Sequence, residues 1–253
     1  MKKLTILKSS SALVFAIALA GSCLPASAQV ISWNFDGYGT INGSGEYAGV
    51  VSANYWNDTY LIDGNSGNPE SNLIDNTGTP TTLSASFVDN SQYGYAIQFS
   101  GQSADADGQY NKALLNGYLN NGNGASTIIS LTGIPYSAYN IYVYLSSDTA
   151  NRTGTVSVGG TSYDFSTIGP AEISGANALL TATTDTTGAN PAADYAEFTG
   201  LTGASQSLTT TIPAYGGIAG FQIVATPEPG TLALASLGGL GLLGLTRRMK
   251  ARQ

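Results

Sequence analysis

The side chains that could carry out chemistry in this chain are almost all carboxylates. Histidine does not occur among the 253 residues, and Cys23 is the single cysteine. A Ser-His-Asp triad and a histidine metal site are therefore excluded, and a cysteine nucleophile depends on Cys23 alone. A glycosidase needs only two carboxyl groups about 5 to 9 Å apart. Asp194 with Glu197, or Asp105 with Asp107, could supply such a pair.

Each carboxylate pair also has a simpler interpretation. The run Asp105–Gly108 has the composition of a polar loop, in which aspartate commonly bonds its own backbone. Glu197 shares the polar side of a predicted strand with Tyr195, whereas Asp194 belongs to the opposite side. Solvated loops and strand faces therefore account for these residues, and we expect no enzymatic activity.

Two acidic runs could instead hold a calcium ion. Asp63–Asn68 and Asp105–Gly108 both combine hard oxygen ligands with glycines that favour turns. Neither run completes an EF-hand loop. The sequence therefore predicts no obligatory cofactor, and it leaves a structural calcium ion as an option, with Asp63, Asn65, Asp105 and Asp107 as the candidate ligands.

The charge balance of residues 29–226 limits the possible partners. This segment holds 15 acidic residues against Lys112 and Arg152, a net charge of −13. Two cations cannot displace the counterions of a phosphate backbone, so nucleic acid is excluded as a partner. The acidity is typical of a protein that stays soluble outside the cell.

Tyrosines offer a possible ligand face. All 15 tyrosines and both tryptophans lie within residues 29–226. Tyr142 and Tyr144 share one side of a predicted strand, and a tyrosine ring suits both the C–H face and the hydroxyls of a sugar. Tyrosine is also common in strands for packing alone, which is the alternative for this pair. Trp33 and Trp56 are expected in or near the core.

The elements that must position these residues are predicted to be β-strands. Period-two alternation around Ile31–Phe35, Tyr93–Phe99 and Tyr139–Leu145 predicts half-buried strands. Further predicted strands are Leu83–Val88, Ser126–Leu131, Gly154–Val158, Thr161–Phe165, Tyr195–Leu201, Ser207–Ile212 and Gly217–Val224. Leu114, Leu115, Tyr118 and Leu119 fall at helical spacing, which predicts one helix in the run 111–120. The sequence therefore predicts an all-β, two-sheet antiparallel sandwich, of jelly-roll or galactose-binding-like type, with one short helix.

The N-terminal segment 1–28 has the pattern of a secretory signal peptide. Lysines precede an apolar run, and the small-residue triplet Ala26–Ala28 fits cleavage by signal peptidase. The alternative is a lipoprotein signal in which Cys23 would be acylated. Cleavage after Ala28 would leave residues 29–226 as one cysteine-free domain exported by the general secretion machinery.

The C-terminal segment 227–253 has three parts. Pro227-Glu228-Pro229 is a stiff extended motif, residues 231–246 are apolar and uncharged, and Arg247 and Arg248 begin a basic tail, 247–253. The apolar run is predicted to be a single transmembrane helix, with the basic tail in the cytoplasm. At about 1.5 Å per residue, this helix would cover about 24 Å of a hydrocarbon layer about 30 Å thick. Because the helix is short, we expect it to keep the protein in the membrane only transiently.

The order of these parts resembles the PEP-CTERM sorting signal of bacterial exported proteins. The resemblance implies recognition by an exosortase, a membrane-embedded cysteine transpeptidase that processes substrates near this motif. It also implies a Gram-negative inner membrane as a transient location, and a cell surface or biofilm matrix containing exopolysaccharide afterwards. Pro227, Glu228, Pro229, Arg247 and Arg248 are the sorting residues that it implies.

The body has a resemblance of its own. AGVVSANYWND, LLNGYL, ISLTGIPYSAYNIYVYLSSD, YAEFTGLTG and GIAGFQIV follow one another in an order similar to that of a group of uncharacterised bacterial surface proteins with galactose-binding-like sandwiches. No activity is attached to that group. We therefore expect a non-catalytic envelope or matrix protein that could bind carbohydrate, with a secreted carbohydrate-active enzyme as the alternative.

Overall fold

The computed structural model describes residues 29–35, 41, 45–59, 70–88, 94–96, 104–120, 126–212 and 215–226. They fall in the segment Gln29–Thr226, which forms one compact unit. The predicted signal peptide and the predicted transmembrane helix, 231–246, lie outside the described residues. Within the described part of the chain, no helix is long and apolar enough to span a bilayer.

The first sheet has eight strands. Its central strand is β14 (Gly216–Ala225), which pairs with β8 (Ala138–Ser147) on one side and with β1 (Val30–Phe35) on the other. β12 (Tyr195–Thr202) and β11 (Ala182–Thr183) continue the sheet beyond β8, and β2 (Asn57–Thr59) follows β1. β6 (Gly117–Asn120) pairs with the start of β14 and with β5 (Gly94–Ala96).

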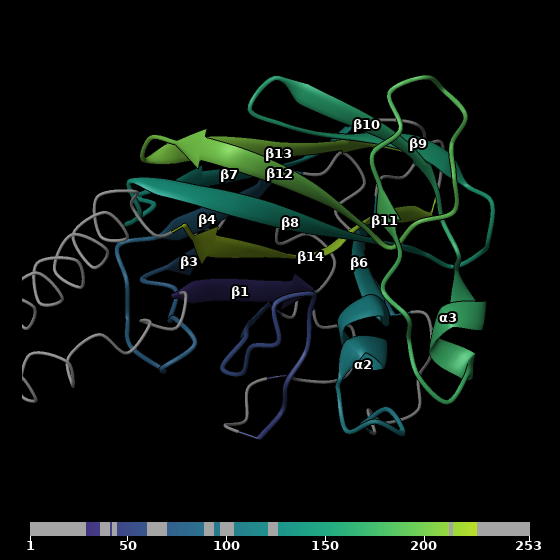
Figure 1. The fold of residues 1–253 in the computed structure, drawn as a ribbon, viewed down its shortest axis with the longest axis horizontal. Helices are drawn as coiled ribbons and strands as arrows, with labels where there is room; N and C mark the ends of the chain where they lie inside the picture. The colour runs from purple at the N-terminus through teal and green to yellow at the C-terminus, as the bar shows by residue number, and fades with distance from the viewer. Residues whose placement is uncertain are drawn as a thin grey trace, which may run out of the picture. The chain divides into compact units, whose positions relative to one another are not determined.

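The second sheet has six strands in the order β10-β9-β13-β7-β4-β3. Their bounds are Thr161–Ser166, Thr153–Val158, Ser205–Thr211, Ser126–Thr132, Ser84–Val88 and Glu70–Ser71. Figure 1 shows the two layers, with β9, β10 and β13 above β8 and β14. All pairs in this sheet are antiparallel.

One hydrophobic core fills the space between the sheets. Trp33 on β1 stacks on Phe87 of β4 in the opposite sheet, with 4.8 Å between ring centroids, and on Phe221 of β14 at 5.6 Å. Aliphatic side chains from both layers complete the core, among them Ile129, Val143 and Leu208. The body is therefore a two-layer β-sandwich, and the prediction that Trp33 and Trp56 lie in the core is confirmed by their burial.

The strand prediction holds for most of the described residues, but half-burial is wrong for β1 and β14 of the first sheet, whereas β12 alternates as predicted. All six residues of β1 and nine of the ten residues of β14 are buried. Their polar side is covered by residues 45–56, which we call the cover segment. Val50 N donates to the Tyr144 hydroxyl at 2.8 Å, and Trp56 packs 6.0 Å from the Tyr144 ring. The outer face of this sheet is therefore buried where the cover segment lies over β14 and Tyr144 of β8.

Gln222 anchors the cover segment to the sheet. Its Oε1 accepts from the Tyr144 hydroxyl at 2.5 Å and from Val51 N at 3.3 Å. Its Nε2 donates to Val51 O at 2.8 Å and to Ser32 Oγ at 3.1 Å. A fully buried amide is tolerated because every one of these bonds replaces a bond to water.

Gly49 permits the close approach of the cover segment. Its φ is +91°, a left-handed conformation that favours glycine, and a Cβ at this position would collide with the Gln222 side chain. Its amide donates to Asn111 Oδ1 at 2.8 Å, which links the cover segment to the neighbouring helix.

The helical prediction is correct only in its first half. α2 (Asn111–Leu115) occupies the predicted start, but Tyr118 and Leu119 belong to strand β6. Their spacing fits either structure, and pairing with β14 and β5 favours the strand. A second short helix, α3 (Pro170–Ser174), begins at a proline directly after Gly169 and was not predicted.

The antiparallel prediction also needs a correction. β2 pairs with β1 and β11 pairs with β12 in parallel, each over two or three residues. Both are short strands at an edge of the sheet, and a crossover connection precedes each parallel pair. Short edge strands limit pairing with the sheets of other chains. The jelly-roll and galactose-binding-like assignments stay predictions.

Glu70 points into the sandwich from the edge strand β3. It lies opposite Ala85, whose side chain is in the core, and Trp33 donates a side-chain hydrogen bond to it. Desolvation raises the pKa of Glu70 from 4.5 to about 7, although the bond from Trp33 opposes this. An inward carboxyl on an edge strand also discourages pairing with another sheet.

This burial predicts a pH-dependent stability near neutrality. Because the folded pKa is raised, the contribution of Glu70 is fully present below about pH 4.5 and is lost as the pH rises through about 7. The melting temperature should therefore fall between pH 5 and pH 8, and Glu70→Gln should flatten that slope and raise the melting temperature at pH 8. Thermal melts of both forms across this range test the prediction. An unchanged slope in the variant would contradict it.

Candidate functional site

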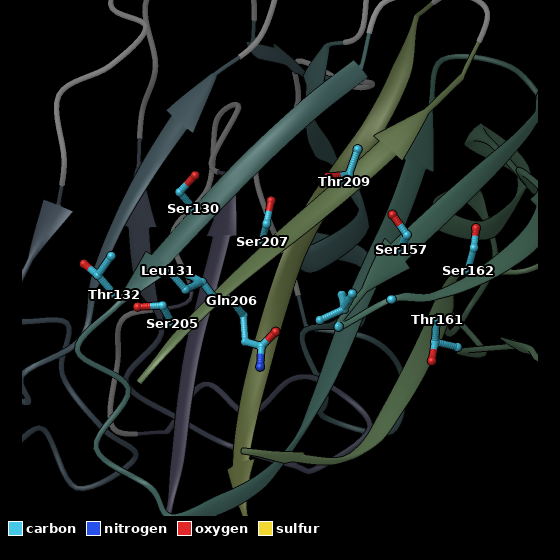
Figure 2. Close-up of a pocket in the computed structure, with 13 residues that line it drawn as sticks. Ser130, Leu131, Thr132, Ser157, Thr161, Ser162, Ser205, Gln206, Ser207 and Thr209 are labelled. Atoms are coloured by element: carbon cyan, nitrogen blue, oxygen red, sulfur yellow. The ribbon is translucent and has the colours of Figure 1, made fainter. Parts of the chain in front are cut away.

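The outer face of the second sheet carries a hollow of about 770 Å³. We call it the hydroxyl hollow. It lies over β7, β13, β9 and the start of β10, and Figure 2 shows polar side chains rising from these neighbouring strands. Its lining consists of Ser130, Leu131, Thr132, Ser157, Val158, Gly159, Gly160, Thr161, Ser162, Ser205, Gln206, Ser207 and Thr209, none of which carries a charge.

Strand register places these hydroxyls in rows. Ser86, Ser130 and Ser207 lie opposite one another across β4, β7 and β13, and Thr209, Ser157 and Ser162 do so across β13, β9 and β10. Within the described residues, the eight serine and threonine hydroxyls of the lining make no hydrogen bond to the protein. They are therefore available to a ligand or to water. This site was not predicted from the sequence, because alternating serines indicate only the outer face of a strand.

A second group of polar side chains lies on the outer face of the first sheet. Asn140, Tyr142, Tyr195 and Glu197 form what we call the tyrosine–glutamate cluster. Glu197 lies directly opposite Tyr142 across the β12–β8 pair, and the Tyr142 hydroxyl donates to Glu197 Oε1 at 2.8 Å. Asn140 Nδ2 donates to the same oxygen at 3.1 Å. Two residues singled out separately in the sequence, Tyr142 and Glu197, are thus brought together.

Tyr142 and Tyr144 do not form the exposed ligand face that the sequence suggested. They share a side of β8, as predicted, but Tyr144 is 0% exposed beneath the cover segment and Tyr142 is 9% exposed. Burial raises the pKa of the Tyr144 hydroxyl, which is engaged by Gln222 and Val50. Packing therefore accounts for Tyr144, and Tyr195 on the neighbouring strand is only half-buried.

Each of the two carboxylate pairs named from the sequence has one buried member. Asp194 is buried, and its Oδ2 accepts from Thr181 N at 2.9 Å, whereas Glu197 lies on the opposite side of β12. Asp105 is buried as well: its Oδ1 accepts from Lys112 N and its Oδ2 from Ala178 N. These bonds assign Asp194 and Asp105 to loop and helix positioning.

Two of the four candidate calcium ligands, Asp105 and Asp107, lie in the described part of the chain. Asp107 is exposed and its Oδ1 accepts from Gln109 N, so it caps a turn as the loop composition indicated. No group of three or more acidic, histidine or cysteine side chains suited to a metal occurs in the described part of the chain. Asp63 and Asn65 lie outside the described residues, and a structural calcium ion stays a prediction.

The C-terminal segment indicates how the protein is exported and sorted. Its features define an exported protein with a C-terminal sorting signal, held at the membrane before processing. Specifically, residues 225–248 match the family model described as the PEP-CTERM protein-sorting motif. The segment is therefore an exosortase-substrate sorting signal, as the resemblance implied, although Pro227, Glu228, Pro229, Arg247 and Arg248 lie outside the described residues.

The body has no such counterpart. No curated protein and no solved structure matches the chain. The resemblance of residues 31–224 to galactose-binding-like surface proteins is therefore unsupported, and the function of the body has to be inferred from its own geometry.

Proposed function

We propose that this exosortase-processed protein is a non-catalytic component of the bacterial surface or extracellular matrix that binds neutral polysaccharide in the hydroxyl hollow. The observation that carries the proposal is the set of eight unengaged hydroxyls in an uncharged concavity on a body of net charge −13. A neutral polyhydroxylated chain can exchange hydrogen bonds with hydroxyl groups, each of which both donates and accepts. An anionic polymer would be repelled by the body as a whole.

The lining also favours binding without turnover. Glycoside hydrolysis requires a pair of carboxyl groups beside the scissile bond, and the hollow is lined by serine, threonine, glutamine, glycine, leucine and valine only. Carbohydrate binding and a matrix location are in turn consistent with a sorting signal that delivers the protein beyond the inner membrane. A Gram-negative cell envelope is part of the same proposal.

A blocking substitution tests the hollow. Ser207→Tyr should fill its centre and weaken binding about tenfold, because Ser207 lies on the middle strand, β13, between β7 and β9. Thr155→Tyr is the matched control: Thr155 is exposed on the same face and does not line the hollow. Affinity electrophoresis of the exported protein in gels containing a neutral glucan, mannan or galactan measures the effect.

The outcomes separate binding from catalysis. Retardation that Ser207→Tyr abolishes and Thr155→Tyr preserves would support the proposal, provided that a parallel assay detects no new reducing ends. Equal retardation of all three forms, preference for an anionic polysaccharide, or release of sugar from the gel would each refute it.

A further inference from the structure

The tyrosine–glutamate cluster holds a carboxylate with one oxygen engaged and one available. Glu197 Oε1 accepts from Tyr142 and Asn140, as described above. No hydrogen bond to Oε2 is found within the described residues. Glu197 itself is half-buried, so its negative charge is only partly screened by water.

A β-bulge fixes the orientation of this carboxylate. The pairing of β12 with β8 is interrupted between Phe198 and Leu201, opposite Asn140. Gly200 in the bulge donates its amide to Asn140 Oδ1 at 3.1 Å, which turns Nδ2 towards Glu197. Bulges often re-aim side chains next to functional sites. The amide and the carboxylate are therefore positioned before any ligand arrives.

Aromatic rings surround the carboxylate. The Tyr195 ring lies 6.2 Å from both the Tyr142 and Tyr144 rings, tilted by 46° and 45°. Tyr195 is two residues from Glu197 on the same side of β12 and is half-buried, so part of its ring is open to solvent. Desolvation and then the negative charge of Glu197 raise the pKa of Tyr195, as expected beside an anion.

No protein cation neutralises Glu197 in the described part of the chain. The body has only two cations. Arg152 pairs with Asp148 at 3.1 Å, and Lys112 lies near Asp105. A half-buried carboxylate next to tyrosine rings, without a cationic partner, is the arrangement that proteins use to hold organic ammonium groups.

We propose that the tyrosine–glutamate cluster binds a protonated amine carried by a non-acetylated amino sugar, with the ammonium on Glu197 Oε2 and against the Tyr195 ring. The carboxylate supplies a charge-assisted hydrogen bond, and the ring supplies a cation–π contact together with an apolar surface for the sugar. The site is on the opposite face of the sandwich from the hydroxyl hollow, so the proposal does not depend on neutral polysaccharide binding.

Binding of glucosamine oligosaccharides to the exported protein, purified in a neutral detergent, tests the proposal by calorimetry. The fully N-acetylated oligosaccharide of equal length is the control ligand, because it has no ammonium group. We expect the free-amine form to bind at least about tenfold more tightly at pH 6, and the preference to disappear when the pH exceeds the pKa of the sugar amine.

Four variants locate the binding. Glu197→Gln should weaken binding about tenfold or more, and Tyr195→Leu should weaken it independently of the carboxylate. Asp107→Asn removes one negative charge from an exposed position outside the cluster, and it should bind like the parent. Thr155→Tyr, an exposed position on the other sheet that does not line the hydroxyl hollow, should also bind like the parent. Circular dichroism and thermal melts verify that each variant is folded.

Several results would overturn the proposal. Equal affinity for the acetylated and free-amine oligosaccharides would exclude ammonium recognition. Equal losses in Glu197→Gln and Asp107→Asn would mean that only the net charge matters. A lysine-rich peptide that binds more tightly than the amino sugar would refute the sugar as the source of the amine.

Discussion

Replacing Gln222 by leucine should lower the free energy of unfolding by about 2–4 kcal/mol, although leucine is close to glutamine in size. The substitution removes four hydrogen bonds at once. It leaves the buried Ser32 hydroxyl without its bond from Gln222, and it leaves the buried Tyr144 hydroxyl with only the bond that it accepts from Val50 N. For a domain of this length, the melting temperature should fall by roughly 10 °C.

Gln29→Leu is the matched control for this effect. Gln29 is exposed, and its interaction with Ala225 uses only its backbone carbonyl. Its replacement should change stability by less than about 0.5 kcal/mol. Thermal or urea unfolding of the three forms makes the comparison. A Gln222→Leu protein as stable as the parent would mean that Gln222 does not anchor the cover segment.

Replacing Glu228 by alanine should block processing of the sorting segment. Glu228 is the only charged residue within the motif 227–229, so the change removes the one ionic contact that the motif can offer a processing enzyme. In the parent, mass spectrometry of protein recovered from producing cells should find a C-terminus near Pro227 and no peptide containing Arg247. The variant should remain in the membrane as the full-length form.

Gly230→Ser is the control for this experiment, because it changes the neighbouring residue without altering charge. Its processing should match that of the parent. If mature surface protein of the parent instead ends at Gln253, the segment acts as a plain membrane anchor. If Glu228→Ala is processed normally, the negative charge has no part in recognition.

The strands were predictable because alternation is a local property. The order of Ile141, Tyr142 and Val143 alone predicts which side chains share a side of β8, and the structure agrees. Alternation cannot say what covers the second side. Gln222 is buried because the cover segment, 171 residues earlier in the chain, folds over it. No pattern within β14 carries that information.

The two candidate sites were unpredictable for a related reason. Each depends on which strands become neighbours, and a single sequence does not specify pairing. Ser130 and Ser207 share the hydroxyl hollow because β7 pairs with β13, and Tyr142 meets Glu197 because β8 pairs with β12. The sorting motif, by contrast, is one contiguous stretch of sequence, so it could be recognised without knowledge of strand pairing.

The position of β14 has a consequence for the route by which the protein leaves the cytoplasm. Among the described residues, β14 is the last strand, yet it lies between β8 and β1, which is the first. A chain that crosses the membrane N-terminus first cannot close the first sheet until residues 216–225 have emerged. Joining strands nearly 190 residues apart also carries a large loop-closure entropy and slows folding. We therefore expect this order of strands to delay closure of the first sheet until residues 216–225 have crossed the membrane.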